Sequence, residues 1–127
     1  MKWSLQQLIK LTQRPFSFEE SYDFSEEASK IEDILSIGEI KVEGTVSRLY
    51  DDRYEFDLHI WGILTLEDAR TLEPAPFEVD LKVTEVFDKV VNDDEDVRYI
   101  EKNTVDLREV IWENILLEKP IRFVKED

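Results

Sequence analysis

The feature of the sequence that most constrains the fold is an alternation of apolar and polar side chains over residues 54–66. The even positions, apart from Gly62, are all apolar: Tyr54, Phe56, Leu58, Ile60, Leu64 and Leu66. A period of two residues is typical of a strand with one buried face. Because the apolar Trp61 and Ile63 interrupt the polar set on the odd positions, we expect a strand that is bent or bulged at Gly62 and covered on both faces at its far end.

This strand also predicts its neighbour in the sheet. Residues 50–52 leave room only for a short turn, and Asp51 and Asp52 are typical turn residues. The strand should therefore pair with residues 40–48, where apolar and polar positions also alternate. If this register is right, the side chains of Phe56, Leu58 and Ile60 are buried together.

Other segments show the same strand periodicity. Aromatic side chains of one parity mark residues 16–24, and an alternation over residues 77–87 follows a turn predicted at 67–76 with two prolines. A shorter apolar run at 97–100 gives a weaker strand signal. Residues 89–96 include four consecutive acids and predict a solvated loop.

Helix signals lie near both ends of the chain. Ser4 and Gln7 have the spacing of a capping box, and Leu5, Leu8 and Ile9 form one apolar face. A second box, Asp106 with Glu109, predicts a helix from 107 to about 117 that ends before Pro120. A third, shorter helical stretch is expected at 26–35, capped by Ser25.

Together these signals predict an α+β fold, in which an antiparallel meander sheet curls towards a barrel and is flanked by an N-terminal and a C-terminal helix. A length of 127 residues suits one domain, residues 1–127. Within it we distinguish a basic N-terminal helical segment, residues 1–15, from an acidic α+β body, residues 16–127.

Charge is distributed unevenly between these two parts. The chain has 16 Lys and Arg against 31 Asp and Glu, a net charge of −15. Residues 1–18 hold Lys2, Lys10 and Arg14 with no acid, which is +3, so the rest carries −18. The N-terminal helix can bind a partner, or it can dock on its own acidic domain.

The overall charge limits the classes of partner. A body of this charge argues against a broad nucleic-acid footprint and against binding to an anionic membrane surface. No apolar run approaches the roughly 20 residues of a membrane span, and no signal peptide opens the chain, so we expect a cytoplasmic protein without a membrane partner.

Residues for catalysis or metal binding are scarce. The chain has no cysteine, and its one histidine, His59, lies on a strand face where an exposed or hydrogen-bonded role is expected. The acidic run at 93–96 lacks the spacing and the glycine of a calcium loop. We therefore expect no enzymatic activity, no cofactor and no metal.

Three segments in order resemble the YceD family of large-ribosomal-subunit RNA accumulation proteins, found in bacteria and chloroplasts. They are the opening Met-Lys-Trp with Gln-Leu at 7–8, residues 62–72 ahead of Pro-Phe at 76–77, and residues 105–107 continuing to 113–120. The resemblance implies a non-enzymatic cytoplasmic factor needed for the accumulation or processing of large-subunit ribosomal RNA.

The sequence departs from the family pattern in the central turn. Many members have a C-x-x-C pair there with an arginine between the cysteines, whereas this chain has Asp68 and Thr71 at the pair positions. Zinc held by thiolates is excluded here. Arg70 is the residue that the resemblance marks as a candidate contact; alternatively, it pairs with Glu67 or Asp68 and orders the turn.

Two functional hypotheses remain open. In the first, the protein contacts precursor ribosomal RNA directly, through Lys2, Trp3, Lys10, Arg14 and Arg70. In the second, it is an acidic protein-binding module, or chaperone, that shields a basic ribosomal or assembly protein. Charge favours the second, because an acidic body repels phosphate and attracts Lys/Arg-rich segments over a long range.

Overall fold

The computed structural model describes residues 2–90 and 96–125. Its strands are β1 (Lys2–Ser4), β2 (Phe16–Tyr22), β3 (Ile34–Ile37), β4 (Ile40–Tyr50), β5 (Arg53–Glu67), β6 (Pro74–Asp88), β7 (Val97–Tyr99) and β8 (Thr104–Asp106). Its helices are α1 (Leu5–Leu11), α2 (Ser25–Ala28) and α3 (Leu107–Glu118), with a 3-10 turn at Glu101–Asn103. The predicted α+β class is confirmed. Most of the acidic run at 93–96 lies outside the described residues.

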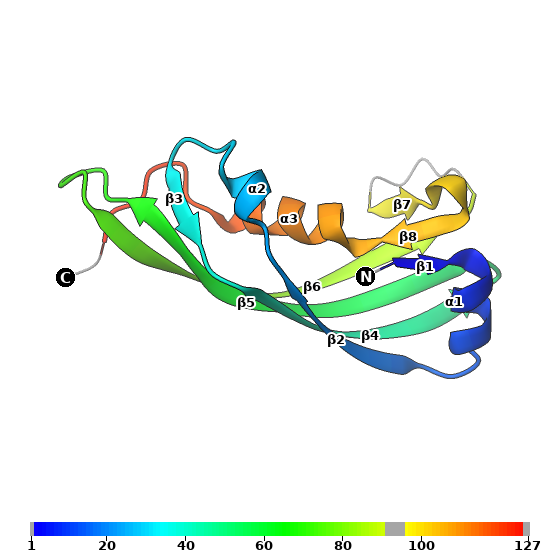
Figure 1. Cartoon of the computed structure of the whole chain (residues 1–127). Coiled ribbons are helices and arrows are strands. Elements are labelled where there is room, and N and C mark those ends of the chain that lie inside the picture. Colours follow the sequence, from blue (N-terminus) through cyan, green and yellow to red (C-terminus); the bar gives the residue numbers. More distant parts are fainter. Residues whose placement is uncertain (1, 91–95, 126–127) are drawn as a thin grey trace.

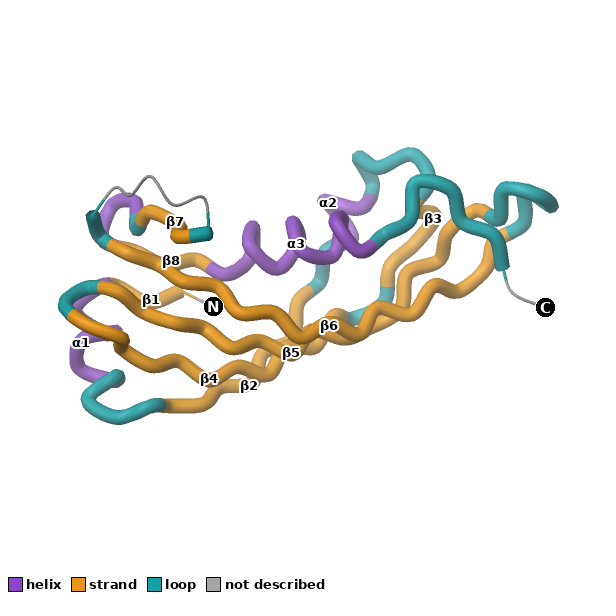
Figure 2. The backbone as a smooth tube through the Cα atoms, turned by 180° about the vertical axis from the view of Figure 1, so that it is seen from behind, coloured by secondary structure: helices purple, strands orange, loops and turns teal. Residues whose placement is uncertain are grey.

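The elements form two layers (Figures 1 and 2). The long strands make one twisted sheet, and α2, α3 and a small sheet of β1 with β8 cover one of its faces. We call this the inner face. The opposite, outer face has no helix or strand of the described chain over it. α1 lies at one end of the sheet, beside β1.

The large sheet is open. Its strand order is β2-β4-β5-β6-β7, and β3 pairs with β5 beside the end of β4. All these pairs are antiparallel except β6 with β7, which is parallel. The predicted closure towards a barrel is therefore not reached, since β2 and β7 remain as two separate edges.

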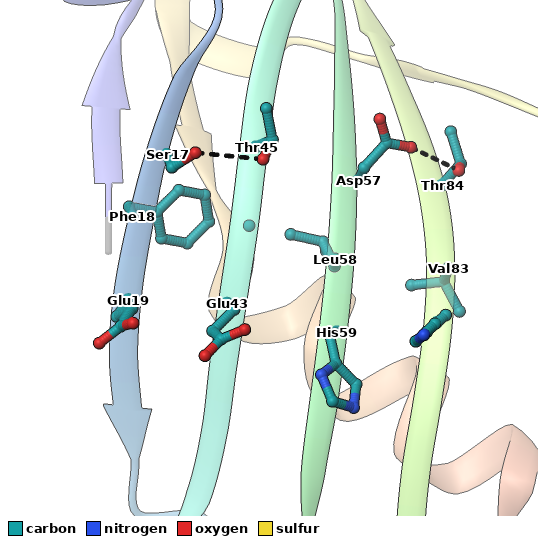
Figure 3. Close-up of a pocket in the computed structure, with 12 residues that line it drawn as sticks. Ser17, Phe18, Glu19, Glu43, Thr45, Asp57, Leu58, His59, Val83 and Thr84 are labelled. Carbon is teal, nitrogen blue, oxygen red and sulfur yellow. Dashed lines mark hydrogen bonds between the residues drawn. The ribbon is translucent and has the colours of Figure 1, made fainter.

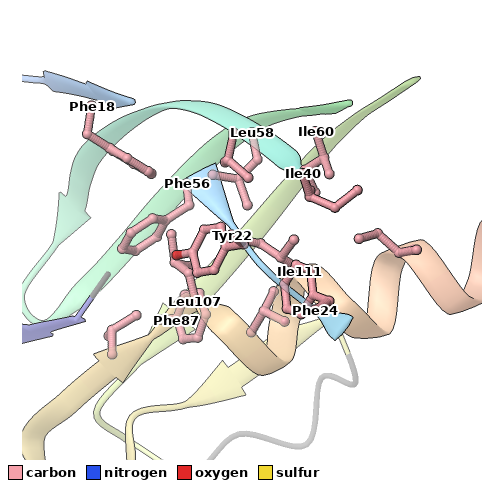
Figure 4. Close-up of a cluster of buried hydrophobic side chains, with 14 of the residues drawn as sticks. Phe18, Tyr22, Phe24, Ile40, Phe56, Leu58, Ile60, Phe87, Leu107 and Ile111 are labelled. Atoms are coloured by element: carbon pink, nitrogen blue, oxygen red, sulfur yellow. The ribbon is translucent and has the colours of Figure 1, made fainter. Parts of the chain in front are cut away.

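β5 is the central strand, and its predicted register is confirmed. It pairs with β4 from Arg53 opposite Tyr50 to Trp61 opposite Lys41. The side chains of Phe56, Leu58 and Ile60 are all buried. Figure 4 shows them in one cluster with side chains of β2 and α3.

The predicted bulge at Gly62 is wrong in its position. β5 pairs with β6 without a register shift from residue 53 to residue 67. The irregularity lies in the neighbour instead, where Gly38 and Glu39 separate β3 from β4. A Cβ on Gly62 would lie 2.9 Å from the Glu39 carbonyl oxygen, so glycine allows this break to approach β5. Ile63 is 54% exposed, so the far end of β5 is not covered on both faces.

The core lies between the inner face and the covering layer. Trp3 of β1 packs against Phe18 of β2, with ring centroids 5.0 Å apart, and against Phe56 of β5 at 5.5 Å. α3 contributes Leu107, Val110, Ile111 and Ile115. Full burial of a large apolar side chain stabilises the fold by roughly 1.5–3 kcal/mol. These contacts hold the N-terminal and C-terminal elements on the same sheet.

The predicted N-terminal capping box is confirmed. The Ser4 hydroxyl accepts a hydrogen bond from the N–H of Gln7, at 3.1 Å, and the Gln7 side chain accepts one from the N–H of Ser4, at 2.8 Å. Leu5 and Leu8 are buried, whereas Ile9 is 40% exposed. The helix is thus docked on its own domain, one of the two alternatives left open by the sequence.

α3 begins as predicted at Leu107. Asp106 caps it by accepting a hydrogen bond from the N–H of Arg108, at 3.0 Å. The Arg108 guanidinium in turn donates to the Glu27 carboxylate of α2, at 2.7 and 3.0 Å. These bonds lower the pKa of Glu27 and fix α2 against α3.

The predicted helix at 26–35 is wrong beyond its first turn. α2 ends at Ala28, and Ile34–Ile37 extends along β5 as β3. β4 leaves the end of β5 unpaired, and a strand there satisfies backbone groups that a helix could not reach. Burial of Ile34 on the sheet adds to this preference.

The two prolines of the predicted turn lie in β6. Pro74 is opposite Glu67 and Pro76 is opposite Thr65. This part of β6 is an edge of the sheet, because β7 pairs only with residues 86–88. Proline lacks a backbone donor and is tolerated at such an edge.

Candidate functional site

The basic side chains of the N-terminal segment lie on the surface. Lys2, with its side chain 70% exposed, is 3.8 Å from the Asp106 carboxylate. Lys10 and Arg14 are exposed. Trp3, which the sequence analysis included as a candidate contact, is only 5% exposed and belongs to the core. Its role in this structure is packing, because a ring enclosed by Phe16, Phe18 and Phe56 cannot reach a partner.

A fourth cation joins this region through the sheet register. Phe16 of β2 is opposite Val46 of β4, so Arg14 and Arg48, each two residues beyond this pair, lie at the same end of the sheet. We call Lys10, Arg14 and Arg48 the basic end. The next turn adds Tyr50, which is 56% exposed. Sequence reasoning missed Arg48 because its place depends on a pairing between distant segments.

The turn between β5 and β6 is organised by Asp68, which is only 2% exposed. One carboxylate oxygen accepts hydrogen bonds from the N–H groups of Arg70 and Thr71, at 2.7 and 3.1 Å. The other accepts from the N–H of Lys125, at 2.9 Å. These three backbone bonds lower the pKa of Asp68.

Asp68 thereby connects the turn to the C-terminal segment 121–125. The N–H of Ala69 donates to the Phe123 carbonyl, at 2.9 Å, and the Phe123 ring packs edge-on against Phe77, with centroids 5.7 Å apart. The Arg70 guanidinium donates to the Lys125 carbonyl, at 3.0 Å. Arg70 therefore contributes to ordering this region, through the C-terminal segment as well as the turn.

The basic end and the Arg70 turn are not brought together. Figure 1 shows α1 at one end of the long sheet and the β5–β6 turn at the other. A single small ligand cannot contact both. Each is a separate surface of the molecule.

The outer face of the sheet carries a shallow trough that crosses four strands (Figure 3). Two cross-strand rows form its walls, one of Ser17, Thr45, Asp57 and Thr84 and one of Glu19, Glu43, His59 and Lys82. The intervening row, which includes Gly44, presents its backbone as the floor. The Thr84 hydroxyl donates to Asp57 at 2.7 Å, so this part of the wall is ordered.

Glu19 and Glu43 are direct cross-strand partners and both are exposed. Like charges in this position destabilise a sheet, so the pair leaves an unfavourable interaction on the outer face that a cation would relieve. Sequence reasoning missed the pair because β2 and β4 are joined in space only by the topology.

His59 has the surface role that the sequence predicted. Its Nε2 lies 2.6 Å from a carboxylate oxygen of Asp80, and its ring stacks on Trp61 with centroids 4.5 Å apart. Its side chain is 34% exposed. These contacts hold the ring on the outer face.

The described part of the chain holds neither a metal-binding cluster of side chains nor a helix that could span a membrane. No group of three or more Asp, Glu or His side chains is placed to hold a metal ion there. None of the helices within residues 2–90 and 96–125 has both the length and the apolar character to cross a bilayer.

Comparisons with known proteins agree with the resemblance found in the sequence. The sequence profile of a family described as "Large ribosomal RNA subunit accumulation protein YceD" matches residues 56–127. A protein of Bacillus subtilis (strain 168), described as "Uncharacterized protein YlbN", is 32% identical over 129 residues, which cover 99% of this chain and 74% of that protein. No solved structure matches the chain. The profile match includes the β5–β6 turn and α3, and the relative covers almost the whole chain; the chain belongs to the YceD family.

Proposed function

We propose that this protein supports the accumulation of large-subunit ribosomal RNA in the cytoplasm, as a binding factor that catalyses no reaction. Family membership supports the role in RNA accumulation. The open outer face of the sheet supports a binding function, since a broad polar face with a shallow trough suits contact with a macromolecule. The cross-strand pair of like charges, Glu19 with Glu43, carries the choice of partner.

The partner that fits the outer face best is a basic ribosomal or assembly protein. By register, the face presents seven acids and two lysines, which are Glu19, Glu43, Glu55, Asp57, Glu67, Glu78 and Asp80 with Lys41 and Lys82, besides the ion pair of Arg53 with Asp88. The whole chain adds a net charge of −15, which draws Lys/Arg-rich segments towards it and repels nucleic acid. Covering a basic protein in this way would keep it from premature contact with RNA.

The test compares two triple variants with the same change in charge. One replaces Glu19, Glu43 and Glu78 on the outer face with glutamine. The other replaces the exposed Glu26, Glu32 and Glu101, which lie away from it. We expect the first variant to weaken binding to purified basic ribosomal proteins by about tenfold or more at 0.15 M salt, and the second by about threefold or less.

Cells provide the second readout for these variants. In cells depleted of the native protein, the outer-face variant should fail to restore large-subunit ribosomal RNA, and the control variant should restore it. Equal binding and equal rescue by both variants would refute the outer face as the functional surface.

Direct RNA contact is a second candidate, which the basic end favours. Lys10, Arg14 and Arg48 place three cations at one end of the sheet (Figure 1), and the exposed Tyr50, whose ring has the Arg53 guanidinium over one face at 5.0 Å, has a second face for base stacking. Three phosphate contacts give a slope of about −2 to −3 in a plot of log binding constant against log salt. A gel shift with ribosomal RNA fragments at several salt concentrations measures this slope, and replacement of all three cations by glutamine should abolish it.

A further inference from the structure

The two edges of the large sheet differ in how they are protected. Exposed edges usually carry proline or lysine, or are short, because they can pair with another strand. The β6 and β7 edge follows this rule, with Pro74 and Pro76 in β6 and only three residues in β7. β2, the other edge, is protected in a different way, by two glutamates. It pairs with β4 in unbroken register over seven residues and holds no proline or lysine.

Charge determines which strands this edge can accept. Glu19 and Glu20 are consecutive in the middle of β2, with Glu19 on the outer face and Glu20 on the inner face, and Asp23 follows the strand. Two copies of this edge repel each other, so the glutamates prevent self-pairing. The same charges attract a strand that carries lysine or arginine.

Hollows lie over the sheet next to β2, on the side of the strand that pairs with β4. The trough begins at Ser17 and Glu19, and a second hollow is lined by Glu19, Glu20 and Ser21 with residues of β4. A third hollow continues from Ser21 to Ser25. Long lysine or arginine side chains of an added strand can extend from the edge into these hollows, while main-chain hydrogen bonds to β2 supply affinity.

We propose that β2 binds an extended Lys/Arg-rich segment of the partner protein as an additional antiparallel or parallel strand of the sheet. This inference rests on the proposed function, because it takes the partner to be a basic protein. It adds the mode of recognition: backbone pairing with β2, and basic side chains directed at Glu19 and the adjoining outer face on one side and at Glu20 on the other.

The experiment uses the full chain and three nine-residue peptides that alternate lysine with valine or threonine. The first peptide is unmodified. The second carries N-methyl groups on four consecutive backbone amides, which blocks both of its edges. The third carries one methyl group on each of four lysine side chains, which keeps the charge and the backbone donors.

Fluorescence anisotropy should show that backbone methylation weakens binding by about tenfold or more, because each methyl group removes a donor that pairs with β2. Side-chain methylation should change affinity by about twofold or less. Hydrogen exchange should show that the unmodified peptide protects backbone amides in residues 16–22 more than those of β6.

Charge reversal of the edge provides an independent measurement. Glu19→Lys with Glu20→Lys should reduce peptide affinity by about tenfold or more, and Glu26→Lys with Glu32→Lys, of equal charge change, by about threefold or less. Circular dichroism checks that both variants fold. If the edge variant does not fold, the methylated peptides still test the proposal on the native protein.

The outcomes separate this inference from the proposed function. If the unmodified peptide binds as tightly as the backbone-methylated one, and protection lies outside β2, strand addition is refuted while the basic partner stands. If neither the peptide nor any purified basic ribosomal protein binds, the partner class itself is refuted.

Discussion

Asp68 joins two segments that lie 57 positions apart in the chain, through its bond from the N–H of Lys125. Backbone N–H groups donate all three hydrogen bonds to the oxygens of Asp68, so these bonds stabilise the ionised carboxylate.

The pKa of Asp68 predicts an acid-sensitive contact. Because the folded pKa is lowered, the contribution of this carboxylate is present above its ordinary value of about 3.9 and is lost as the pH falls through the folded value. We therefore expect the 121–125 segment to stay in place at neutral pH and to detach only in strong acid. Near-ultraviolet absorbance and amide exchange measure the detachment. Both are recorded over about pH 2–5, a range chosen around the ordinary aspartate pKa.

Asp68→Asn should detach the same segment at neutral pH. An asparagine places an N–H₂ group against either the turn or the N–H of Lys125, so one set of bonds is lost. Hydrogen exchange at Lys125 and Ala69 is the measurement. Glu67→Gln, which removes the neighbouring exposed carboxylate, is the control and should leave exchange unchanged; equal protection in both variants contradicts the role given to Asp68.

Trp3 and Lys10 test the division between packing and surface residues in the N-terminal segment. Trp3→Ala removes a buried ring and should lower the free energy of unfolding by about 3–5 kcal/mol. Lys10→Ala changes an exposed residue and should alter it by no more than about 0.5 kcal/mol. Chemical denaturation measures both. A small loss of unfolding free energy in Trp3→Ala would show that the ring is less enclosed than its 5% exposure indicates.

At the scale of elements, β5 carries the core of the protein. Leu58→Ala, on its buried face, should lower the free energy of unfolding by about 2–5 kcal/mol. Ile63→Ala, at an apolar side chain of the same strand that is 54% exposed, should cost much less. Urea denaturation compares the two, and equal losses would contradict the register observed for β5.

The break between β3 and β4 gives a second test at this scale. An added Cβ at Gly62 would meet the Glu39 carbonyl at 2.9 Å and the Ile40 Cδ1 at 2.6 Å, so Gly62→Ala should destabilise by about 1–3 kcal/mol. At Gly38 the nearest atom is 3.4 Å away, and Gly38→Ala should be neutral or stabilise by up to about 1 kcal/mol. Thermal unfolding measures both; the reverse order of effects would place the close approach elsewhere.

At the scale of the whole molecule, the net charge of −15 weakens the folded state by repulsion among its acids. Added salt screens this repulsion, with a Debye length of about 10 Å at 0.1 M. We expect the melting temperature to rise as sodium chloride is increased from low concentration. The control variant that neutralises Glu26, Glu32 and Glu101 should show a smaller rise, and a fall in melting temperature would show that ion pairs such as Arg108 with Glu27 dominate instead.

Local physical chemistry determined much of this fold from the sequence alone. The alternation of β5 places Phe56, Leu58 and Ile60 on one face whatever surrounds the strand, because successive side chains point to opposite faces. The bonds between Ser4 and Gln7 need only four neighbouring residues. The surface position of His59 follows from the same alternation.

Tertiary structure decided the features that depend on distant partners. Ile34–Ile37 becomes strand β3 because β5 offers an unpaired edge there, an interaction that outweighs the local helical pattern at 26–35. Trp3 is enclosed because β1 pairs with β8, and Arg48 lies at the same end of the sheet as Arg14 because β2 pairs with β4. The edge of β2 and the contact of Asp68 with Lys125 likewise exist only after the chain has closed on itself, since their energies come from groups that the sequence keeps far apart.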